Sequence, residues 1–375
     1  MQSGNSSYIL WITENYFPNT GGMAQSCDRI VQGLRDRGLN IGLVHFRATK
    51  SSVKMKTVNH GFNMVVPVNE DEAHAYNLLY NFLINPGFKY EFSHIIAFGG
   101  YLPILGAPII SRLLNIPLII LLRGNDFDVA LYSPRKRDML FYALNTSRTI
   151  CTVSKDQSDK VQKLYPHPDI RYIPNGLDVA SWSPHKSEQE MAADWKQKHV
   201  PADKKVIGIF GQLKPKKGID SFIDAIIRSG HAESLFLLIT GDIYPEFSER
   251  LEVSGIQYHI SPFIDRYELL SWYPACDAIA IPSFYDGMPN VLLEAGALGI
   301  PIISANTGGM KDILVEGENG FLFHPGDEEG CAMAIKRFIN CGTATLSKMG
   351  QNIKQLIVNL YNGNIEVEQY LKIFD

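Results

Sequence analysis

Paired cysteines, long apolar runs and an excess of either charge are all missing from this chain of 375 residues. Its five cysteines are scattered and none forms a CxxC pair, which excludes an obvious disulfide framework or zinc site and favours buried thiols in a reducing compartment. No run approaches the roughly 20 apolar residues of a membrane span. The net charge of -4 argues against a nucleic-acid-binding protein, which should be strongly basic.

Motifs of two hydrolase classes are absent as well. The ten histidines show no H-E-x-x-H spacing and no G-x-S-x-G elbow occurs, so zinc and serine hydrolases lack support. The first residues, MQSGNSSY, place no basic segment before an apolar stretch, and we therefore expect a cytoplasmic protein without a signal peptide. The basic run SPRKRD (133–138) is a candidate for weak peripheral contact with the inner membrane face, although a solvated surface is favoured.

Short apolar runs alternate with helical patterns along most of the chain. Apolar runs without a period of two are typical of strands covered on both faces, and their alternation with helices indicates parallel sheets. A polar stretch at 180–203 interrupts the pattern, and a single core rarely grows beyond about 250–300 residues. We therefore expect two doubly wound α/β domains that face a cleft, with ligands beyond the carboxyl ends of the strands. The expected strands lie in 8–13, 41–46, 94–100, 117–124, 149–154, 170–176, 205–211, 234–242, 256–263, 278–283, 301–305 and 320–325.

The segment YDGMPNVLLEAGALGIPIISANTGG (285–309) sets two carboxylates around the start of an apolar helix. Pro289 suits the first helical turn, and the unpaired amides of that turn form a ready anion site. Asp286 precedes the helix and Glu294 lies more than a turn into it. Such an arrangement could bind a sugar linked to a nucleoside diphosphate; the alternative is that Asp286 is a loop cap and Glu294 a solvated helix residue.

Together with four other stretches, this segment resembles the donor-binding signature of the GT-B glycosyltransferases of family 4, whose usual form is E-x7-E. Asp286 stands at the first position and Glu294 at the second, so the spacing holds although the first acid is one methylene shorter. The resemblance covers nearly the whole chain. It implies two Rossmann-like domains, 1–175 on the acceptor side and 176–355 on the donor side, with a helical segment, 356–375, that returns towards the first. The other matching stretches are ENYFPNTGGMAQSCDRIVQGLRDRG, IPNGLD, GIFGQLKPKKGID and TGGMKDILVEGENGFLFHPGD.

The resemblance implies a retaining, metal-independent hexosyltransferase without a cofactor, which moves a sugar from a UDP- or GDP-linked donor to the hydroxyl of a glycan, lipid-linked or small-molecule acceptor. Asp286 is then expected to contact the transferred sugar and Glu294 the ribose, while the base lies near Phe263 and Ile264. One continuous segment is expected to hold the sugar and the phosphates through its backbone: Gly287, Met288, Pro289, Asn290, Val291 and Leu292.

The basic loop GQLKPKKG (211–218) is expected to supply cations for the leaving diphosphate, whose developing charge such groups stabilise. Lys217 matches the lysine of the family. Gln212 stands where the family has an arginine, and it can donate a hydrogen bond but carries no charge. Lys214 or Lys216 could compensate; the alternative for these two is a solvated loop.

Polar and glycine-rich loops follow strands in the first half too. By the resemblance, Gly21 and Gly22 lie beside the donor diphosphate, and a second group lies on the acceptor side: Gly99, Gly100, Asn125 and Asp126. An ordinary strand-to-helix turn is the alternative for the first two.

Arg123 stands where the family often has a histidine, and it is expected to act in catalysis by binding phosphate or an acidic acceptor. The alternative is a loop that Arg–Asp pairs hold together. Asp126 and Asp128 spell D-x-D, which holds a divalent metal in a different transferase fold, but so short a motif arises often by chance.

Three hypotheses stay open beside the transferase. A nucleotide-sugar epimerase or hydrolase of the same fold would release product without an acceptor. A catalytically impaired sugar-nucleotide-binding partner subunit would fit Gln212 and Arg123, and would bind nucleotide without turnover. A metal-dependent transferase acting through Asp126 and Asp128 would lose activity in EDTA.

Overall fold

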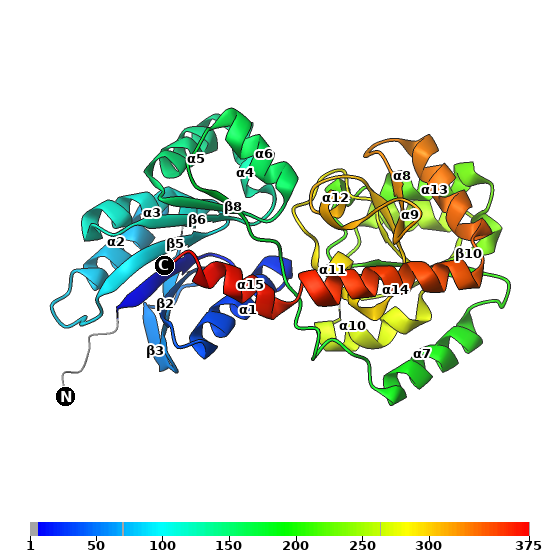
Figure 1. The fold of residues 1–375 in the computed structure, drawn as a ribbon, viewed down its shortest axis with the longest axis horizontal. Helices are drawn as coiled ribbons and strands as arrows, with labels where there is room; N and C mark the ends of the chain where they lie inside the picture. Colours follow the sequence, from blue (N-terminus) through cyan, green and yellow to red (C-terminus); the bar gives the residue numbers. More distant parts are fainter. Residues whose placement is uncertain (1–6, 70, 263, 375) are drawn as a thin grey trace. The chain divides into compact units, whose positions relative to one another are not determined.

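The computed structural model describes residues 7–69, 71–262 and 264–374 and shows two compact units (Figure 1). Unit 1 comprises Met1–Asn175 and Gly363–Asp375, and unit 2 comprises Gly176–Asn362. Each unit has its own sheet with helices on both faces. The predicted fold class, two Rossmann-like α/β domains, is confirmed.

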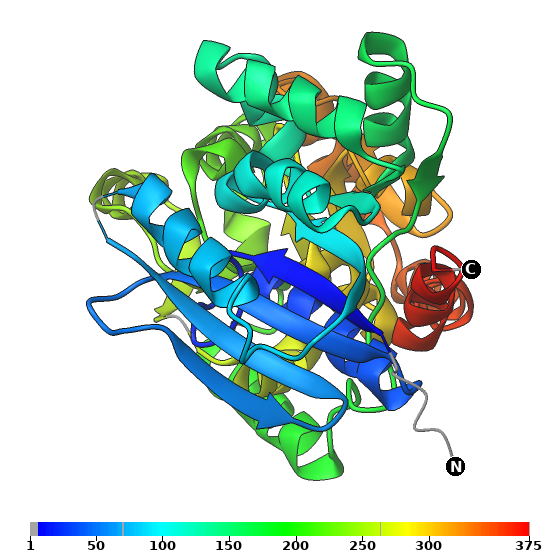
Figure 2. The same cartoon turned by 90° about the vertical axis from the view of Figure 1, so that its left-hand side faces the viewer.

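Unit 1 contains an eight-stranded sheet in the order β3-β4-β2-β1-β5-β6-β7-β8, in which β3 alone is antiparallel to its neighbour. Figure 2 shows the blue strands β2, β3 and β4 at one edge of this sheet. The strands are β1 (Tyr8–Thr13), β2 (Asn40–Ala48), β3 (Lys54–Val58), β4 (Gly61–Val68), β5 (Phe92–Phe98), β6 (Leu118–Leu122), β7 (Thr149–Thr152) and β8 (Ile170–Tyr172). The helices are α1 (Gly22–Asp36), α2 (Glu72–Leu83), α3 (Tyr101–Leu114), α4 (Asn125–Leu131), α5 (Pro134–Thr146), α6 (Lys155–Leu164) and α15 (Gly363–Leu371).

The final helix, α15, packs on α1 beside the sheet of unit 1 (Figure 1). A side chain at Gly33 of α1 would collide with Val367, so the glycine permits the close approach of the two helices. Val367, Tyr370 and Ile373 are buried in one apolar cluster with strands β1, β2 and β5. The opposite face of the sheet holds a second apolar cluster, which α2, α3 and α5 cover.

Unit 2 contains a fully parallel six-stranded sheet in the order β11-β10-β9-β12-β13-β14. Its strands are β9 (Lys205–Phe210), β10 (Leu235–Thr240), β11 (Gln257–Ser261), β12 (Ala278–Ile281), β13 (Ile302–Ala305) and β14 (Gly320–Phe323). Its helices are α7 (Lys186–His199), α8 (Ile219–Ser229), α9 (Pro245–Val253), α10 (Arg266–Trp272), α11 (Asn290–Leu298), α12 (Met310–Ile313), α13 (Glu328–Asn340) and α14 (Thr343–Leu360), with a short 3₁₀ turn, η1 (Pro215–Lys217).

Both sheets reverse their strand order beside a central strand. In unit 2 the chain runs outward from β9 through β10 to β11 and then returns to the other side of β9 as β12. In unit 1 the same reversal separates β2 from β5 on the two sides of β1. Ligands of open α/β sheets bind at such reversals, beyond the carboxyl ends of the strands. The loops after β9 and β12, and those after β1 and β5, are therefore where sites are expected.

Candidate functional site

The loops at the reversal point of unit 2 bring two predicted catalytic residues into contact. Lys217 ends η1, in the loop after β9, and Asp286 lies in the loop after β12. The ammonium of Lys217 donates to Oδ2 of Asp286. The two side chains are 26% and 15% exposed, so the pair is open on one side. A cation and a carboxylate are thus held together at the edge of the sheet where a ligand would approach.

Backbone contacts fix these two loops against each other. Gly218 has φ of +65°, and a side chain there would collide with the carbonyl of Pro282. The amide of Phe284 donates to the carbonyl of Lys216 over 3.0 Å. The ammonium of Lys216 lies 5.7 Å from the ring centre of Tyr285, and burial lowers the pKa of this lysine although the charge of Asp286 raises it.

Gly308 and Gly309, the two glycines after β13, account for the end of the segment 285–309. Gly308 has φ of +50°, and a side chain there would collide with the carbonyl of Asp286. The amide of Gly309 donates to the carbonyl of Gly287. The loop after β13 therefore lies directly against the loop that carries Asp286 and supports it, a role that only a residue without a side chain can fill at position 308.

Glu294 lies inside α11 and is buried rather than solvated. Its Oε2 accepts a hydrogen bond of 2.9 Å from Oη of Tyr273, and Nε1 of Trp182 donates to its backbone carbonyl over 2.9 Å. A helix of apolar character that buries a carboxylate needs compensating donors. The structure thus contradicts the alternative of a solvated surface residue.

The backbone segment predicted to hold phosphate spans the loop after β12 and the start of α11. Pro289 caps α11, which begins at Asn290. The amide of Gly287 donates to Oδ1 of Asp286 over 2.9 Å, and that of Leu292 donates to the carbonyl of Pro289 over 3.1 Å. A ligand that binds these two amides would have to displace these partners, and the predicted role of the segment stays a prediction.

The remaining predicted donor residues lie around the same edge of unit 2. Met288 is buried and Val291 half-buried at the start of α11. Gln212 is exposed, directly after β9, where the family has a positive charge. Ile264 is half-buried beyond the end of β11, and Phe263 lies outside the described residues.

In unit 1, the predicted glycines gather at the reversal point beside β1. Gly21 caps α1 with φ of 109°, Gly22 begins that helix, and Gly100 caps α3 with φ of 82°. A side chain at Gly99 would lie 2.7 Å from Cε of Met23 and 3.2 Å from Oδ2 of Asp126. The loops after β1, β5 and β6 thus meet, as their strand order requires.

A carboxylate that the sequence did not single out already occupies the start of α3. Glu14 follows β1, and its two oxygens accept hydrogen bonds of 3.0 Å from the amides of Tyr101 and Leu102. The sequence feature that could have indicated Glu14 is its position directly after the first strand. Beside it, a cavity of about 470 Å³ opens at the carboxyl ends of β1, β2 and β4, with Asn15, Asn19 and Arg47 among its lining.

Arg123 does not have the predicted catalytic placement. Its side chain is 2% exposed. Nη1 donates to Oη of Tyr370 over 2.6 Å, and Nη2 donates to Oδ1 of Asn175 and lies 3.5 Å from Oε1 of Glu366. A guanidinium that is buried and paired in this way offers no surface to a phosphate. Arg123 is a structural residue that ties the end of β6 to α15.

The two aspartates of the D-x-D motif have separate partners. The carboxylate of Asp126 accepts backbone hydrogen bonds from Arg123, Gly124 and Phe127, and its pKa is nevertheless raised because burial outweighs these donors. Oδ1 of Asp128 lies 3.3 Å from the ammonium of Lys160. Asn125 begins α4. Within residues 7–69, 71–262 and 264–374, no cluster of three or more acidic, histidine or cysteine side chains could hold a metal ion.

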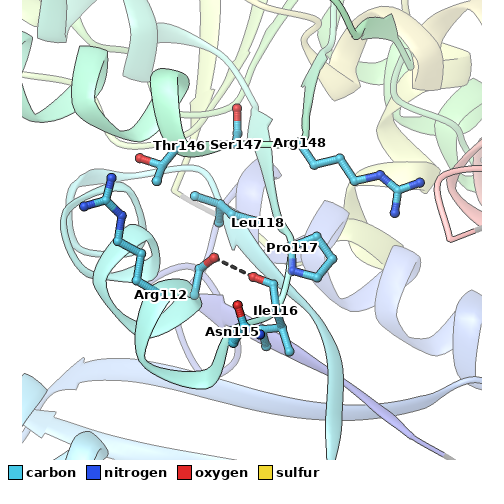
Figure 3. Close-up of a pocket in the computed structure, with 9 residues that line it drawn as sticks. Arg112, Asn115, Ile116, Pro117, Leu118, Thr146, Ser147 and Arg148 are labelled. Carbon is cyan, nitrogen blue, oxygen red and sulfur yellow. Dashed lines mark hydrogen bonds between the residues drawn. The ribbon is translucent and has the colours of Figure 1, made fainter.

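A further cavity of unit 1, about 340 Å³, lies at the opposite edge of the sheet (Figure 3). Figure 3 shows Arg112 and Arg148 on opposite sides of Pro117, next to Leu118, the first residue of β6. Both arginines lie near helix C-termini, where the dipole attracts cations. Because Leu118 is the first residue of β6, the cavity lies at the amino end of that strand and does not belong to the site at the carboxyl ends. No helix in the described parts of the chain is long and apolar enough to cross a bilayer.

Two family descriptions match nearly the whole chain between them. Glycosyl transferases group 1 matches residues 191–356, and Glycosyltransferase Family 4 matches residues 20–181. These two stretches contain all the predicted site loops of unit 2 and most of those of unit 1.

Curated relatives match part of their length. The chain is 28% identical over 237 residues to the UDP-Gal:alpha-D-GlcNAc-diphosphoundecaprenol alpha-1,3-galactosyltransferase of Escherichia coli, covering 60% of this chain and 58% of the relative. It is 29% identical over 211 residues to the D-inositol 3-phosphate glycosyltransferase of Corynebacterium efficiens, covering 53% and 49%. The chain thus spans about half the length of the relatives it matches.

Solved structures match over the full length. The sucrose-phosphate synthase of Thermosynechococcus elongatus superposes with a TM-score of 0.80 at 17% identity, covering 98% of each chain. Anabaena HepE in complex with UDP-glucose superposes with a TM-score of 0.77 at 18% identity, again covering 98% of each. At such identities the likeness shows the fold alone.

Proposed function

The chain belongs to the family 4-like glycosyltransferases of GT-B fold, and from this premise we propose that it transfers a hexose from a nucleotide-sugar donor to an acceptor hydroxyl. The observation that carries the proposal is the Lys217–Asp286 ion pair at the reversal point of the second sheet. The E. coli relative is named for a UDP-linked donor, and HepE was solved with UDP-glucose, which supports a UDP-linked sugar here.

The proposed roles follow the positions of the groups. Lys217 stabilises the negative charge that develops on the leaving diphosphate, which is usually the largest catalytic term in such transfers. Asp286, already in contact with Lys217, accepts hydrogen bonds from hydroxyls of the transferred sugar. The backbone at the start of α11 binds the diphosphate.

Glu294 is proposed to bind the ribose. A ribose hydroxyl would take a place beside Tyr273 on its carboxylate, and the base would lie beyond the end of β11, near Phe263 and Ile264. Gln212 adds a neutral donor to the diphosphate. Acceptors are proposed to bind unit 1 at the cavity beside Glu14. The predicted acceptor-side residues Gly99, Gly100, Asn125 and Asp126 do not line this cavity and stay part of the proposal.

The proposed reaction retains the anomeric configuration. The acceptor oxygen bonds to the anomeric carbon on the face from which the diphosphate leaves, and a phosphate oxygen takes the acceptor's proton. Lys217 supplies the positive charge that this step needs, so we expect turnover to persist in EDTA. Exclusion of water matters because water is a competing acceptor.

A second candidate is a sugar-nucleotide-binding protein with little turnover. It is favoured by the neutral Gln212 at the place of a cation and by the burial of Arg123. This candidate binds nucleotide as tightly as an active enzyme but releases none from a nucleotide sugar. An epimerase or hydrolase would instead release product with no acceptor present.

A thermal-unfolding screen with UDP, GDP, ADP and their sugar conjugates tests the proposal. A nucleotide at 100 times its dissociation constant stabilises the folded protein by about 2.7 kcal/mol. We expect one nucleoside diphosphate to raise the unfolding temperature well above the other two. The absence of any shift at millimolar concentrations would contradict a donor site in unit 2.

A further inference from the structure

A groove runs between α2 and α3 on the outer face of unit 1, apart from the site described above. Its cavity measures about 700 Å³, within the range of small-molecule sites. The two helices lie side by side in Figure 1. Tyr76 of α2 contacts α3, where its hydroxyl donates to the carbonyl of Leu102 and its ring fills the space beside Gly106. Glu72 and Tyr101, the first residues of α2 and α3, are hydrogen-bonded, and Tyr80 and Leu113 further along line the same groove, so the helices run in the same direction.

The two ends of the groove differ in polarity. At the starts of the helices, Oε2 of Glu72 lies 3.1 Å from Nη2 of Arg135 and accepts a hydrogen bond of 3.1 Å from Oη of Tyr101. The ammonium of Lys136 lies 5.3 Å from the ring centre of Tyr101. Lys136 is half-buried beside this end of the groove, outside the cavity lining, and forms no ion pair with a residue in the described part of the chain.

The far end of the groove is apolar and open. Ile109 is 53% exposed and Leu113 is 56% exposed, and both line the cavity with Tyr80. Covering these half-exposed side chains removes apolar surface from water, which favours a ligand with an apolar part. A purely hydrophilic ligand would gain nothing from these residues.

The polar end of the groove adjoins the proposed acceptor site. The amides of Tyr101 and Leu102 are held by Glu14, directly after β1. From Tyr101 to Leu113 the helix rises about 18 Å, at 1.5 Å per residue. A ligand in the groove would thus have its polar head at the carboxyl edge of the sheet and a long apolar tail pointing away from it.

We propose that this groove binds the hydrocarbon chain of a lipid-linked acceptor, with the phosphate that joins chain and sugar beside Lys136. The inference rests on the proposed function and assigns the class of its acceptor. Glu72 does not repel the phosphate strongly, because Arg135 pairs with its carboxylate. The carboxylate of Asp71 is also occupied, since it accepts a hydrogen bond from the amide of Ala73 at the start of α2.

Titration calorimetry of farnesyl diphosphate binding to the full chain tests this assignment. Inorganic diphosphate is the head-group control. We expect farnesyl diphosphate to bind at least 10-fold more tightly than inorganic diphosphate. Leu113→Asp and Ile109→Asp should each weaken it 10-fold or more, and Lys136→Ala should weaken it several-fold. Leu164→Asp is the matched control, since Leu164 on α6 is equally exposed at 56% but does not line the groove.

Three results would overturn the assignment. Equal affinity for farnesyl and inorganic diphosphate would show a head-group site only. Equal loss in Leu113→Asp and Leu164→Asp would show non-specific apolar binding. Binding to phosphatidylglycerol vesicles that Leu113→Asp abolishes, without farnesyl diphosphate binding, would make the groove a membrane contact. UDP titration of the same variants separates this outcome from failure of the proposed function, because the groove variants should leave UDP affinity unchanged.

Discussion

The ammonium of Lys217 and the carboxylate of Asp286, 69 residues apart in the chain, form an ion pair at the carboxyl edge of the second sheet. Their loops follow β9 and β12, the two strands between which the strand order reverses. The pair makes each residue hold the other in place before a ligand arrives. A bound donor would then meet a positioned cation and a positioned acceptor of hydrogen bonds.

Replacing Lys217 by alanine should lower kcat by about 10²–10³, the usual loss when a group that stabilises transition-state charge is removed. Unfolding free energy should change by less than about 1 kcal/mol, because the pair is partly exposed. Lys214→Ala in the same loop is the matched control and should keep parental turnover, since Lys214 is exposed. Release of nucleoside diphosphate in a coupled assay measures both. Parental kcat in Lys217→Ala would remove this lysine from catalysis.

Gly308→Ala should destabilise the protein and weaken nucleotide binding together, because the new methyl group meets the carbonyl of Asp286. Gly326→Ala isolates the backbone effect: its φ of +77° is also left-handed, but nothing lies within 4 Å of the new atom. We expect about 1 kcal/mol of destabilisation at Gly326 and a larger loss at Gly308. Urea unfolding and UDP titration report the two quantities. Equal behaviour of the variants would show that the loop after β13 does not support Asp286.

Glu366→Gln should cost about 3–5 kcal/mol of unfolding free energy, as expected when one partner of a buried ion pair is lost. Glu366 is 1% exposed and pairs with Arg29 at 2.8 Å and with Arg123 at 3.5 Å. Glu328→Gln removes the partner of Arg228 in an exposed pair and should cost less than about 1 kcal/mol. The denaturant midpoints of the two variants measure this difference in unfolding free energy. Similar midpoints would mean that α15 is not anchored through this network.

Acid should destabilise unit 1 through His45, whose pKa burial lowers to about 4. The unfolded chain, with a histidine pKa of about 6.5, binds the proton more readily than the folded chain. Stability from this residue is therefore complete above pH 6.5 and falls as the pH drops towards 4, by up to about 3 kcal/mol. His45→Phe, which keeps a ring against Tyr16, should flatten the profile in this window. His74→Gln, at an exposed position, should leave it unchanged; identical profiles for all three proteins would refute the role of His45.

The fold was predictable because buried parallel strands are continuous apolar runs. β1, β9 and β12 lie within the runs expected from the sequence. Strand β3 was missed because its residues are mostly polar and exposed. Strand β4 was missed although it is apolar and largely buried. Helix α7 was missed as well, because most of its residues are polar and show no clear apolar face, and because it lies in a stretch that interrupts the strand pattern.

The donor loops were predictable from motif spacing, whereas the long-range partners were not. Asp286 and Glu294 follow a fixed interval that a sequence displays. The burial of Arg123 depends on its contacts with Glu366 and Tyr370, which are more than 240 residues away. The sequence around Arg123 gives no indication of these contacts. The same holds for Tyr273 against Glu294. Such pairs arise from the packing of whole elements and are therefore visible only in three dimensions.

Calorimetric titration of UDP into the parent protein, Glu294→Gln and Tyr273→Phe tests the central claim most directly. If the edge of the second sheet binds a sugar nucleotide through the ribose, UDP or GDP binds the parent with one site. Glu294→Gln then binds it at least 10-fold more weakly, because a hydrogen bond to a charged group contributes about 1.5–3 kcal/mol. Tyr273→Phe, which removes only the hydroxyl that donates to Glu294, binds within a few-fold of the parent. A parent that binds neither nucleotide, or a Glu294→Gln variant with parental affinity, would contradict the account.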